Sequence, residues 1–249
     1  MVTPVFRSTY SIGKSVLTID KDSEASGADS IIEICLNNGI KDVILVEDNL
    51  TSFMKAFKAC RDNGLNLMYG VRLTFCNDLS IEDSSSDHQS IIFARDDEGC
   101  RLLNKIYSLA FVEGNGKIDY ASLKTYWDND HLLFIVPFYD SFIHNNNFFL
   151  KNCIPDLNGL NARFWFEDNN LPFDHLLKKK IAQYTNGKHN MSQVKTVCYK
   201  NKEDVEAFQT YKILCNRGFG RLATLSSPNL NHFGSDEFSM ESFNTQIAK

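Results

Sequence analysis

The sequence predicts an α/β fold whose strands close into a barrel. Short runs of branched apolar residues alternate with longer segments that carry apolar side chains on one helical face. The connections between these segments are short, which is typical of parallel strands covered by helices. About six or seven strand–helix pairs fit within roughly 220 residues, and this number favours a barrel over an open sheet.

The N-terminal part of the chain shows this alternation clearly. Residues 2–6, 42–46 and 65–75 are predicted to be strands, and the run at 42–46 is apolar enough to be buried on both faces. Asp29 is expected to cap a helix that ends at Gly39. The core face of that helix is expected to consist of Ile31, Ile32, Cys35 and Leu36. A second helix follows Thr51, and its core face is expected to consist of Phe53, Met54, Phe57 and Cys60.

The remaining strands are predicted at residues 90–95, 132–138, 162–167 and 194–199. Helices are predicted at residues 96–114, 171–187 and 202–218. The first of these helices is expected to bury Leu102, Leu103, Ile106, Leu109 and Ala110. Residues 76–90 are polar and serine-rich and predict a surface loop, while residues 219–249 lack periodicity and predict an irregular tail. Together these segments predict a single domain over residues 1–249.

Composition narrows the function classes. The net charge of −5 and the pI near 5.7 argue against a sequence-blind nucleic-acid coat. No apolar run approaches the ~20 residues of a membrane span, and the N-terminus lacks the apolar core of a signal peptide. Seven cysteines without a CxxC pair are typical of reduced thiols. A cytoplasmic protein is therefore expected.

Glu47 and Asp48 form the first candidate site. They directly follow the branched run at 42–46, and a helix is predicted after them. In a parallel barrel the chemistry lies on loops that follow strands. Adjacent carboxylates at such a point suggest metal-dependent or acid–base chemistry.

Several segments, in collinear order, then resemble one family. They are IIFARDDEGCRLLNKIYSLAFVEG, GKIDYASLKTY, RFWFEDNNLPFDHLLKKKI, CYKNKEDVEAFQTYKILCNRG and HFGSDEFSM. They resemble the polymerase-and-histidinol-phosphatase (PHP) domain, in the version found at the N-terminus of the alpha subunit of bacterial DNA polymerase III. The resemblance implies a distorted seven-stranded barrel of PHP type, with metal ligands that are mostly His, Asp and Glu on strand-end loops.

Position by position, the family's metal ligands are largely replaced. Its first motif is His-x-His followed by Ser-x-Tyr-Ser. Here Val5 and Arg7 stand at the two histidine positions, ahead of Ser8-Thr9-Tyr10-Ser11. At the second motif, Glu47 keeps a carboxylate and Asp48 replaces the histidine.

Two further family motifs also differ. Arg72 stands in place of a bridging glutamate, and the late Asp-x-His becomes Thr196 and Cys198. A multinuclear site needs several imidazoles and carboxylates, and two arginines there would repel cations. No bound cofactor is expected, and at most a weak Mn²⁺ or Zn²⁺ site remains at Glu47 and Asp48. An ion-pair network is the expected replacement if Arg7 and Arg72 meet these carboxylates.

The resemblance implies a role in DNA replication without catalysis. The chain stops nine residues after Met240 and has no Asp-x-Asp motif on an apolar strand, so it is not expected to polymerise DNA. The predicted function is to bind, scaffold or inhibit a polymerase core, a proofreading exonuclease or another replisome protein. A free-standing domain of this kind suits a phage protein acting in the host cytoplasm. The alternatives are a metal-dependent phosphoesterase with altered ligands and a nucleic-acid-binding accessory protein.

The weaker candidates have ordinary structural explanations. Lys178, Lys179 and Lys180 predict a solvated helix face, with a DNA or partner contact as the alternative. The six histidines are not spaced as metal ligands, and surface or capping roles are expected for them. The glycine-rich residues 218–221 predict a helix C-cap and turn. The aromatic and asparagine-rich residues 138–150 predict a partly buried insertion, with a binding loop as the alternative.

Overall fold

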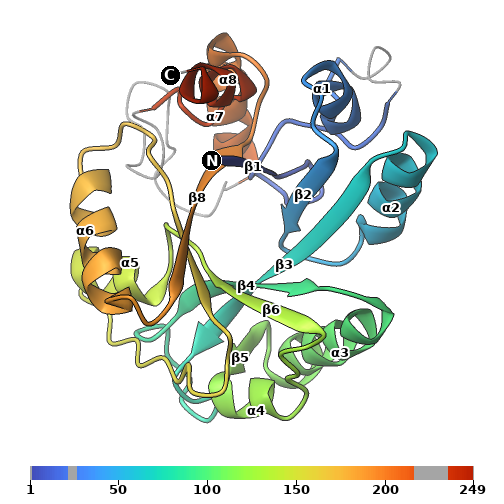
Figure 1. Ribbon diagram of the computed structural model, residues 1–249. Coiled ribbons are helices and arrows are strands. Elements are labelled where there is room, and N and C mark those ends of the chain that lie inside the picture. The colour runs from blue at the N-terminus through green and yellow to red at the C-terminus, as the bar shows by residue number, and fades with distance from the viewer. Residues whose placement is uncertain (1, 22–26, 216–234, 249) are drawn as a thin grey trace. The chain divides into compact units, whose positions relative to one another are not determined.

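The computed structural model describes residues 2–21, 27–215 and 235–248 (Figure 1). Its strands form one mixed sheet in the order β2-β1-β8-β7-β6-β4-β3-β5, and pairing of β2 with β3 closes seven of them into a barrel, with β5 as an additional strand. The predicted α/β barrel is confirmed. The strands are β1 Thr3–Phe6, β2 Asp42–Glu47, β3 Asn66–Cys76, β4 His88–Ala94, β5 Lys117–Asp119, β6 Leu132–Val136, β7 Arg163–Phe166 and β8 Asn190–Val197.

Helices connect most of these strands, as the apolar periodicity predicts. They are α1 Ile31–Asn37, α2 Phe53–Asp62, α3 Asp97–Ser108, α4 Tyr120–Lys124, α5 Phe142–Phe148, α6 Asp174–Thr185, α7 Val205–Cys215 and α8 Met240–Ile247. A π-helical turn, Leu109–Glu113, continues α3, and a 3₁₀ turn, Lys202–Asp204, precedes α7. Among the described residues, no helix has the length and apolar character that a membrane span requires.

The chain divides into two compact units made of interleaved segments. Unit 1 comprises residues 1–68, 167–174 and 193–249, and unit 2 comprises residues 69–166 and 175–192. The long strand β3 begins in unit 1 and continues in unit 2, whereas β8 begins in unit 2 and ends in unit 1. Each unit is described separately below.

In unit 1, β1 lies between two parallel neighbours. Phe6 aligns with Leu45 of β2, and Val5 aligns with Thr196 of β8. Val5, Phe6 and Leu45 are each at most 2% exposed, so these strands contribute buried apolar side chains to the core of unit 1. Because the strands are parallel, their carboxyl ends meet at one edge, where β1 is followed by Arg7 and β2 ends at Glu47.

Two expectations about the helices of unit 1 are wrong in detail. The N-cap of α1 is Ser30, whose hydroxyl accepts from the backbone N–H of Glu33 at 3.4 Å, and Asp29 forms an ion pair with Lys200 at 3.1 Å. In α2 the buried residues are Ala56 and Cys60. The expected core residues Met54 and Phe57 of α2 are 69% and 44% exposed, and Leu36 of α1 is 42% exposed. The packed face of α2 is the one with the smaller side chains, which allow a closer approach.

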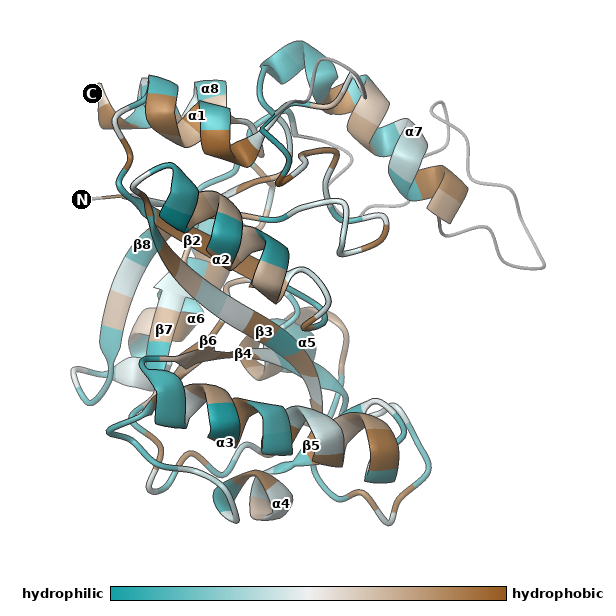
Figure 2. Ribbon diagram, turned by 90° about the vertical axis from the view of Figure 1, so that its right-hand side faces the viewer, coloured by the Kyte–Doolittle hydropathy of each residue, from teal (hydrophilic) through white to brown (hydrophobic). Residues whose placement is uncertain are grey.

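Unit 2 contains the antiparallel part of the sheet. β4 pairs antiparallel with both β3 and β6, whereas β5 runs parallel to β3 and β7 runs parallel to β6. The predicted helix at 96–114 is confirmed as α3 and its π-helical continuation, with Leu103, Ile106 and Ala110 buried. Figure 2 shows hydrophilic residues on the outward face of α3.

Gly99 explains why the start of α3 can pack so closely against the backbone of His131. A Cβ atom at this position would lie 2.2 Å from the backbone oxygen of His131, a distance that no real contact reaches. The carboxylate of Asp96 accepts from the Gly99 N–H at 2.8 Å and caps the helix. The start of α3 therefore requires glycine at position 99.

The loop and tail predictions are correct only in part. Residues 77–87 connect β3 to β4, but Cys76 belongs to β3, and His88 to Ser90 belong to β4. The tail contains a helix, α8, whose N-cap Ser239 accepts from the Ser242 N–H at 3.1 Å. Its short apolar pattern, with Met240 and Phe243 buried, was too brief to show periodicity. Residues 219–234 and the glycine-rich turn at 218–221 lie outside the described residues.

Candidate functional site

Glu47 lies at the carboxyl end of β2 in unit 1 and is fully buried. Its carboxylate accepts hydrogen bonds from the Ser8 N–H at 3.1 Å and from the Ser8 hydroxyl at 2.5 Å. The Ser11 hydroxyl donates to the other carboxylate oxygen. Both oxygens of Glu47 are thus held by the loop that follows β1.

The two serines belong to the Ser8-Thr9-Tyr10-Ser11 stretch, which forms a turn with the Ser11 N–H donating to the Ser8 carbonyl at 3.1 Å. This turn brings both hydroxyls onto one carboxylate. Burial raises the pKa of Glu47, while hydrogen bonds from Ser11 and Ser8 and the charge of Arg7 act to lower it. No partner for these serines was predicted from the sequence, because the carboxylate that Ser8 and Ser11 bind is 39 and 36 positions away.

Asp48 is held by Arg7. The Nη2 of Arg7 lies 2.5 Å from Oδ1 of Asp48, and the arginine side chain is 7% exposed. The Nε of Arg7 is buried and has no hydrogen-bond acceptor among the described residues. The expected ion pair therefore forms between Arg7 and Asp48 on this side of the candidate site.

Arg72 belongs to unit 2, where its Nη1 lies 3.7 Å from Oδ2 of Asp140. Asp140 has a left-handed backbone with a φ of 61° and directly precedes the N-cap of α5. Its role as an arginine partner was not predicted from the sequence. Arg7 and Arg72 thus each have a carboxylate partner within their own unit.

Unit 1 contains a second buried carboxylate, Glu167, which directly follows β7. It accepts from the N–H of Thr196 at 3.1 Å, from the Thr196 hydroxyl at 2.8 Å and from Nδ2 of Asn169 at 2.8 Å. Burial raises the pKa of Glu167, against the effect of these hydrogen bonds. Thr196, a predicted site position, therefore binds a carboxylate of its own chain.

The two other predicted positions contribute to packing. Val5 is 2% exposed within β1. Cys198 is 5% exposed, its N–H donates to the Phe238 carbonyl at 2.8 Å, and its carbonyl accepts from the Ser15 hydroxyl at 2.9 Å. All seven cysteines are free thiols.

Lys195 was missed by sequence reasoning because lysine in a strand usually indicates a solvent-facing position. It is 1% exposed, and its ammonium donates to the Asp168 carbonyl and to Oε2 of Glu237, both at 3.1 Å. Lys202 donates to the other oxygen of Glu237 at 3.0 Å. Burial raises the pKa of Glu237, but hydrogen bonds from Lys202 and Lys195 outweigh it and lower the pKa to about 2.

This lysine–glutamate–lysine arrangement borders a pocket of about 510 Å³ in unit 1. Asp168 and Asn170 line it on one side, and Ser242 and Gln246 of α8 line it on the other. Both ammonium groups bind Glu237, and the other polar residues that line the pocket carry one carboxylate, Asp168, together with amide and hydroxyl groups.

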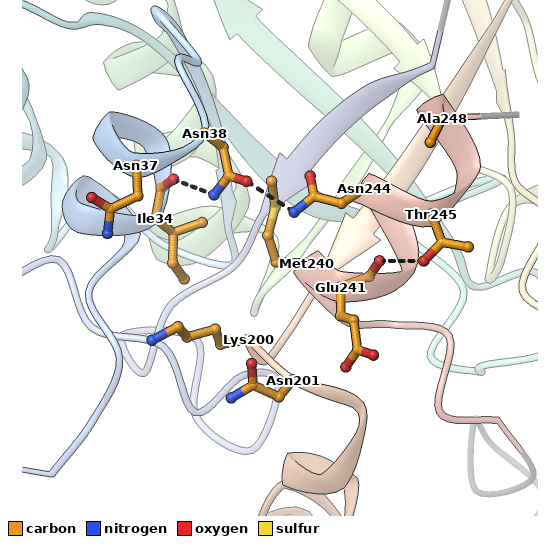
Figure 3. A pocket seen from close by; sticks show the side chains of 10 residues that line it. All are labelled: Ile34, Asn37, Asn38, Lys200, Asn201, Met240, Glu241, Asn244, Thr245 and Ala248. Carbon is orange, nitrogen blue, oxygen red and sulfur yellow. Dashed lines mark hydrogen bonds between the residues drawn. The ribbon is translucent and has the colours of Figure 1, made fainter.

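A second pocket in unit 1, of about 660 Å³, lies between the end of α1 and α8 (Figure 3). Nδ2 of Asn244 donates to Oδ1 of Asn38 at 2.8 Å, and Nδ2 of Asn38 donates to the Ile34 carbonyl at 2.7 Å. Ile34 and Met240 provide its apolar part. The volume lies within the range of small-ligand sites, which is about 300–1,000 Å³.

Metal binding is the chemistry that the sequence made most plausible at Glu47 and Asp48. Within residues 2–21, 27–215 and 235–248, no group of three or more His, Cys, Asp or Glu side chains is arranged to hold a metal ion. The oxygens of Glu47 and Glu167 are engaged by hydroxyl, amide and N–H donors. Such donors compete with a cation for the same lone pairs.

His88 contradicts the expected surface or capping role of the histidines. It is 1% exposed in unit 2, and its ring lies 2.9 Å from both the Ser86 carbonyl and the Tyr120 hydroxyl. Burial lowers its pKa to about 4. By contrast, His131 binds the helix-capping carboxylate of Asp96 at 2.8 Å, as expected for a capping histidine. His232 lies outside the described residues.

The three lysines of α6 are exposed, as the solvated-face interpretation predicts. The Nζ of Lys178 lies 4.6 Å from the centre of the Phe166 ring, a cation–π distance. Lys179 and Lys180 remain the residues of this group that face solvent without such a ring contact among the described residues.

No model of a known protein family and no curated protein matches this chain.

Proposed function

We propose that this chain is a non-catalytic domain of PHP type, related to the alpha subunit of bacterial DNA polymerase III, that acts in DNA replication by binding another replication protein. The proposal combines the ordered sequence resemblance with the geometry of the strand ends. A replication role implies action in the cytoplasm, which is the host's if the protein is phage-encoded. No metal cofactor is required.

The single observation that carries the non-catalytic part is the state of Glu47. A carboxylate that bridges metal ions needs open lone pairs and cationic partners. Glu47 is instead fully buried with Ser8 and Ser11 on its two oxygens. Arg7 neutralises the adjacent Asp48 at 2.5 Å. This arrangement holds the strand ends together without a metal ion. It supports a protein that keeps the barrel fold and has no phosphoesterase activity.

Direct binding of purified proteins tests the proposal. The full chain is titrated against a polymerase III alpha subunit that lacks its own PHP domain, and separately against the proofreading exonuclease. Complex formation is measured by calorimetry and by co-elution. Binding of either protein supports the proposal, and primer extension with and without the chain then distinguishes an activator from an inhibitor. Failure of both proteins to bind contradicts it.

Two separate assays test the alternative functions. Hydrolysis of a generic phosphoester with Mn²⁺ or Zn²⁺, lost in Glu47→Ala and Asp48→Ala, would identify a phosphoesterase with altered ligands. Binding of single- or double-stranded DNA that weakens steeply with salt, and that is lost when Lys179 and Lys180 are replaced by Gln, would identify a nucleic-acid-binding accessory protein.

A further inference from the structure

Two surface segments of unit 2 lie against each other and are joined by hydrogen bonds. One is the connection between β3 and β4, residues 77–87, and the other follows α5, residues 149–156. Asn77 donates to the Asn152 carbonyl and accepts from the Ile154 N–H, both at 2.7 Å. Further along, the Asn152 N–H donates to the Ser85 carbonyl at 3.1 Å, and Lys151 donates to the Ser84 carbonyl at 3.1 Å. These hydrogen bonds hold the backbones of the two segments together, and we call the line along which they meet the seam.

Large apolar side chains project from this seam into solvent. Leu150 is 92% exposed, Ile154 is 64% exposed, Ile81 is 57% exposed and Phe149 is 54% exposed. Single exposed apolar residues are normal, but several of them on adjoining segments indicate an interaction site. We call these four residues the apolar part of the docking face.

Leu150 occupies a backbone position that does not favour leucine. Its φ is 52°, in the left-handed region where glycine is preferred, and it follows the last turn of α5. The Lys151 N–H completes this turn by donating to the Asn145 carbonyl at 3.2 Å. Glycine would serve the turn better, and a side chain that is 92% exposed adds little packing. The side chain at position 150 is therefore not explained by the stability of the fold.

Carboxylates border the apolar residues. Asp78, Glu82 and Asp83 are exposed on the 77–87 segment, and none of the three forms an ion pair with a cation among the described residues. Lys117 contacts this segment: it pairs with Asp87 at 2.8 Å and donates to the Asp83 carbonyl at 3.0 Å, and its charge also acts on the Asp83 carboxylate. Lys151 donates to backbone carbonyls of the loop. The segment therefore carries four carboxylates (Asp78, Glu82, Asp83 and Asp87) against the two lysines that contact it, so the rim of the docking face has an excess of negative charge.

We infer that this docking face binds a segment of a partner protein that presents apolar side chains flanked by lysine or arginine. The charge of the rim selects this occupant. Nucleic acid and anionic lipid surfaces are repelled by Asp78, Glu82 and Asp83, because both carry phosphates. A second copy of the chain would place these same carboxylates against one another. A basic, amphipathic protein segment matches both the apolar centre and the rim.

This inference deepens the proposed function, since it rests on the chain being a binding protein and names the chemistry of the partner. It does not depend on the site formed by Glu47 and Asp48 in unit 1. Residues 138–150 are partly buried, as expected, with Phe138 and Phe142 buried and Phe149 and Leu150 exposed, and the inference gives the exposed end a binding role.

A synthetic peptide tests the docking face with the full chain. The probe is an amphipathic helical peptide with leucines on one face and lysine and arginine beside them. Its matched controls replace every basic residue with glutamate or scramble the order. We expect saturable binding of the basic peptide that weakens with salt, and no binding of either control. Equal binding of the three peptides, or no binding of the basic peptide, would overturn the inference.

Variants locate the binding on the protein. Leu150→Asn combined with Ile154→Asn should weaken binding of the basic peptide at least about fivefold, as expected for central apolar contacts. Met54→Gln, which alters an apolar residue of α2 that is 69% exposed, should leave binding unchanged. Leu150→Gly separates function from folding, because it should weaken binding while the melting temperature stays the same or rises. An unchanged affinity in both Leu150 variants contradicts the inference.

Two further measurements separate the competing occupants and the two proposals. Binding of phosphatidylglycerol vesicles, or dimerisation that is lost in Leu150→Asn, would overturn the choice of a basic protein segment. If a replication protein binds the double variant as tightly as the wild type, the docking face fails while the proposed function stands. If the basic peptide binds and no replication protein does, the docking face stands and the proposed function fails.

Discussion

The Ser11 hydroxyl donates a hydrogen bond to the buried carboxylate of Glu47, and the Ser11 oxygen in turn accepts from the Asp48 N–H at 2.9 Å. One serine thus connects the loop after β1 to Glu47, the last residue of β2, and to Asp48, which follows it. The Glu47 carboxylate and the start of the loop after β2 are therefore held by the same hydroxyl.

Replacing Ser8 and Ser11 with alanine should destabilise the protein. The Ser11 replacement removes the hydroxyl donor of one oxygen of the buried Glu47, and the Ser8 replacement leaves the other oxygen with only the Ser8 backbone N–H. Loss of such a donor costs about 1–3 kcal/mol of the free energy of unfolding. Urea denaturation measures this loss. Ser80→Ala serves as the control, since Ser80 is exposed and its hydroxyl binds only the carboxylate of Asp78. Equal effects at the three positions would show that the Glu47 network is not a stabilising feature.

Divalent metal ions should leave the melting temperature unchanged. Specific binding of a metal to the native state raises the melting temperature by mass action, and the oxygens of Glu47 are already engaged by serine donors. Differential scanning fluorimetry with Mn²⁺, Zn²⁺ or EDTA provides the measurement. A metal-dependent rise that disappears in both Glu47→Ala and Asp48→Ala would show that these two carboxylates bind a metal ion.

Acid should destabilise unit 2 through His88. Its folded-state pKa of about 4 lies below the ordinary value near 6.5, so the unfolded chain binds a proton more readily. The contribution of neutral His88 is complete above about pH 6.5 and is lost as the pH falls toward about 4, with an upper limit of about 3 kcal/mol.

Urea denaturation at several pH values between 7 and 4, with wild type and His88→Phe, isolates this contribution. The variant should show a smaller fall in stability between pH 7 and pH 4. Burial raises the pKa values of Glu47 and Glu167, so those groups act in the opposite direction in both proteins. An identical pH profile for the variant would rule out His88 as a source of acid sensitivity.

Glu237→Gln should destabilise the protein by about 3 kcal/mol, because Lys195 is then a buried cation without its carboxylate. Adding Lys195→Met to this variant should restore part of the loss, since it removes the unpaired charge. Thermal and urea denaturation of the single and double variants give the coupling energy. Asp29→Asn is the matched control, because its ion pair with Lys200 is solvent-exposed and such pairs contribute up to about 1 kcal/mol. Additive effects of the two main changes would exclude the coupling.

The sequence indicates the barrel well because its signals are local. The branched run at 42–46 predicts β2. The alternating elements predict parallel strands, which is correct for β1 with β2 and β8 but wrong for β4, which is antiparallel to both β3 and β6. The apolar residues of α2 are harder to interpret, since they lie on two adjacent faces of the helix. Ala56 and Cys60 face the core while Met54 and Phe57 remain exposed, and periodicity alone does not distinguish the two faces.

The candidate site was predictable only where neighbours in sequence define it. Glu47 and Asp48 stand out because they end a strand. Lys195 and Glu167 do not, because a charged residue in a short strand normally indicates solvent exposure. Their partners, Glu237 and Thr196, are 42 and 29 positions away, so the network emerges only when the strands are brought together.

The interleaving of the two units sets an order of events during synthesis. Unit 2 consists of residues from 69 to 192, whereas unit 1 needs both the first 68 residues and the segment from 193 onward. The ribosome therefore releases every residue of unit 2 before unit 1 can be complete. β1 pairs with β2, which follows it closely in sequence, and with the late part of β8, where Thr3 aligns with Val194. One side of β1 can therefore pair early in synthesis, whereas its pairing with β8 must wait until the residues of unit 2 have been translated.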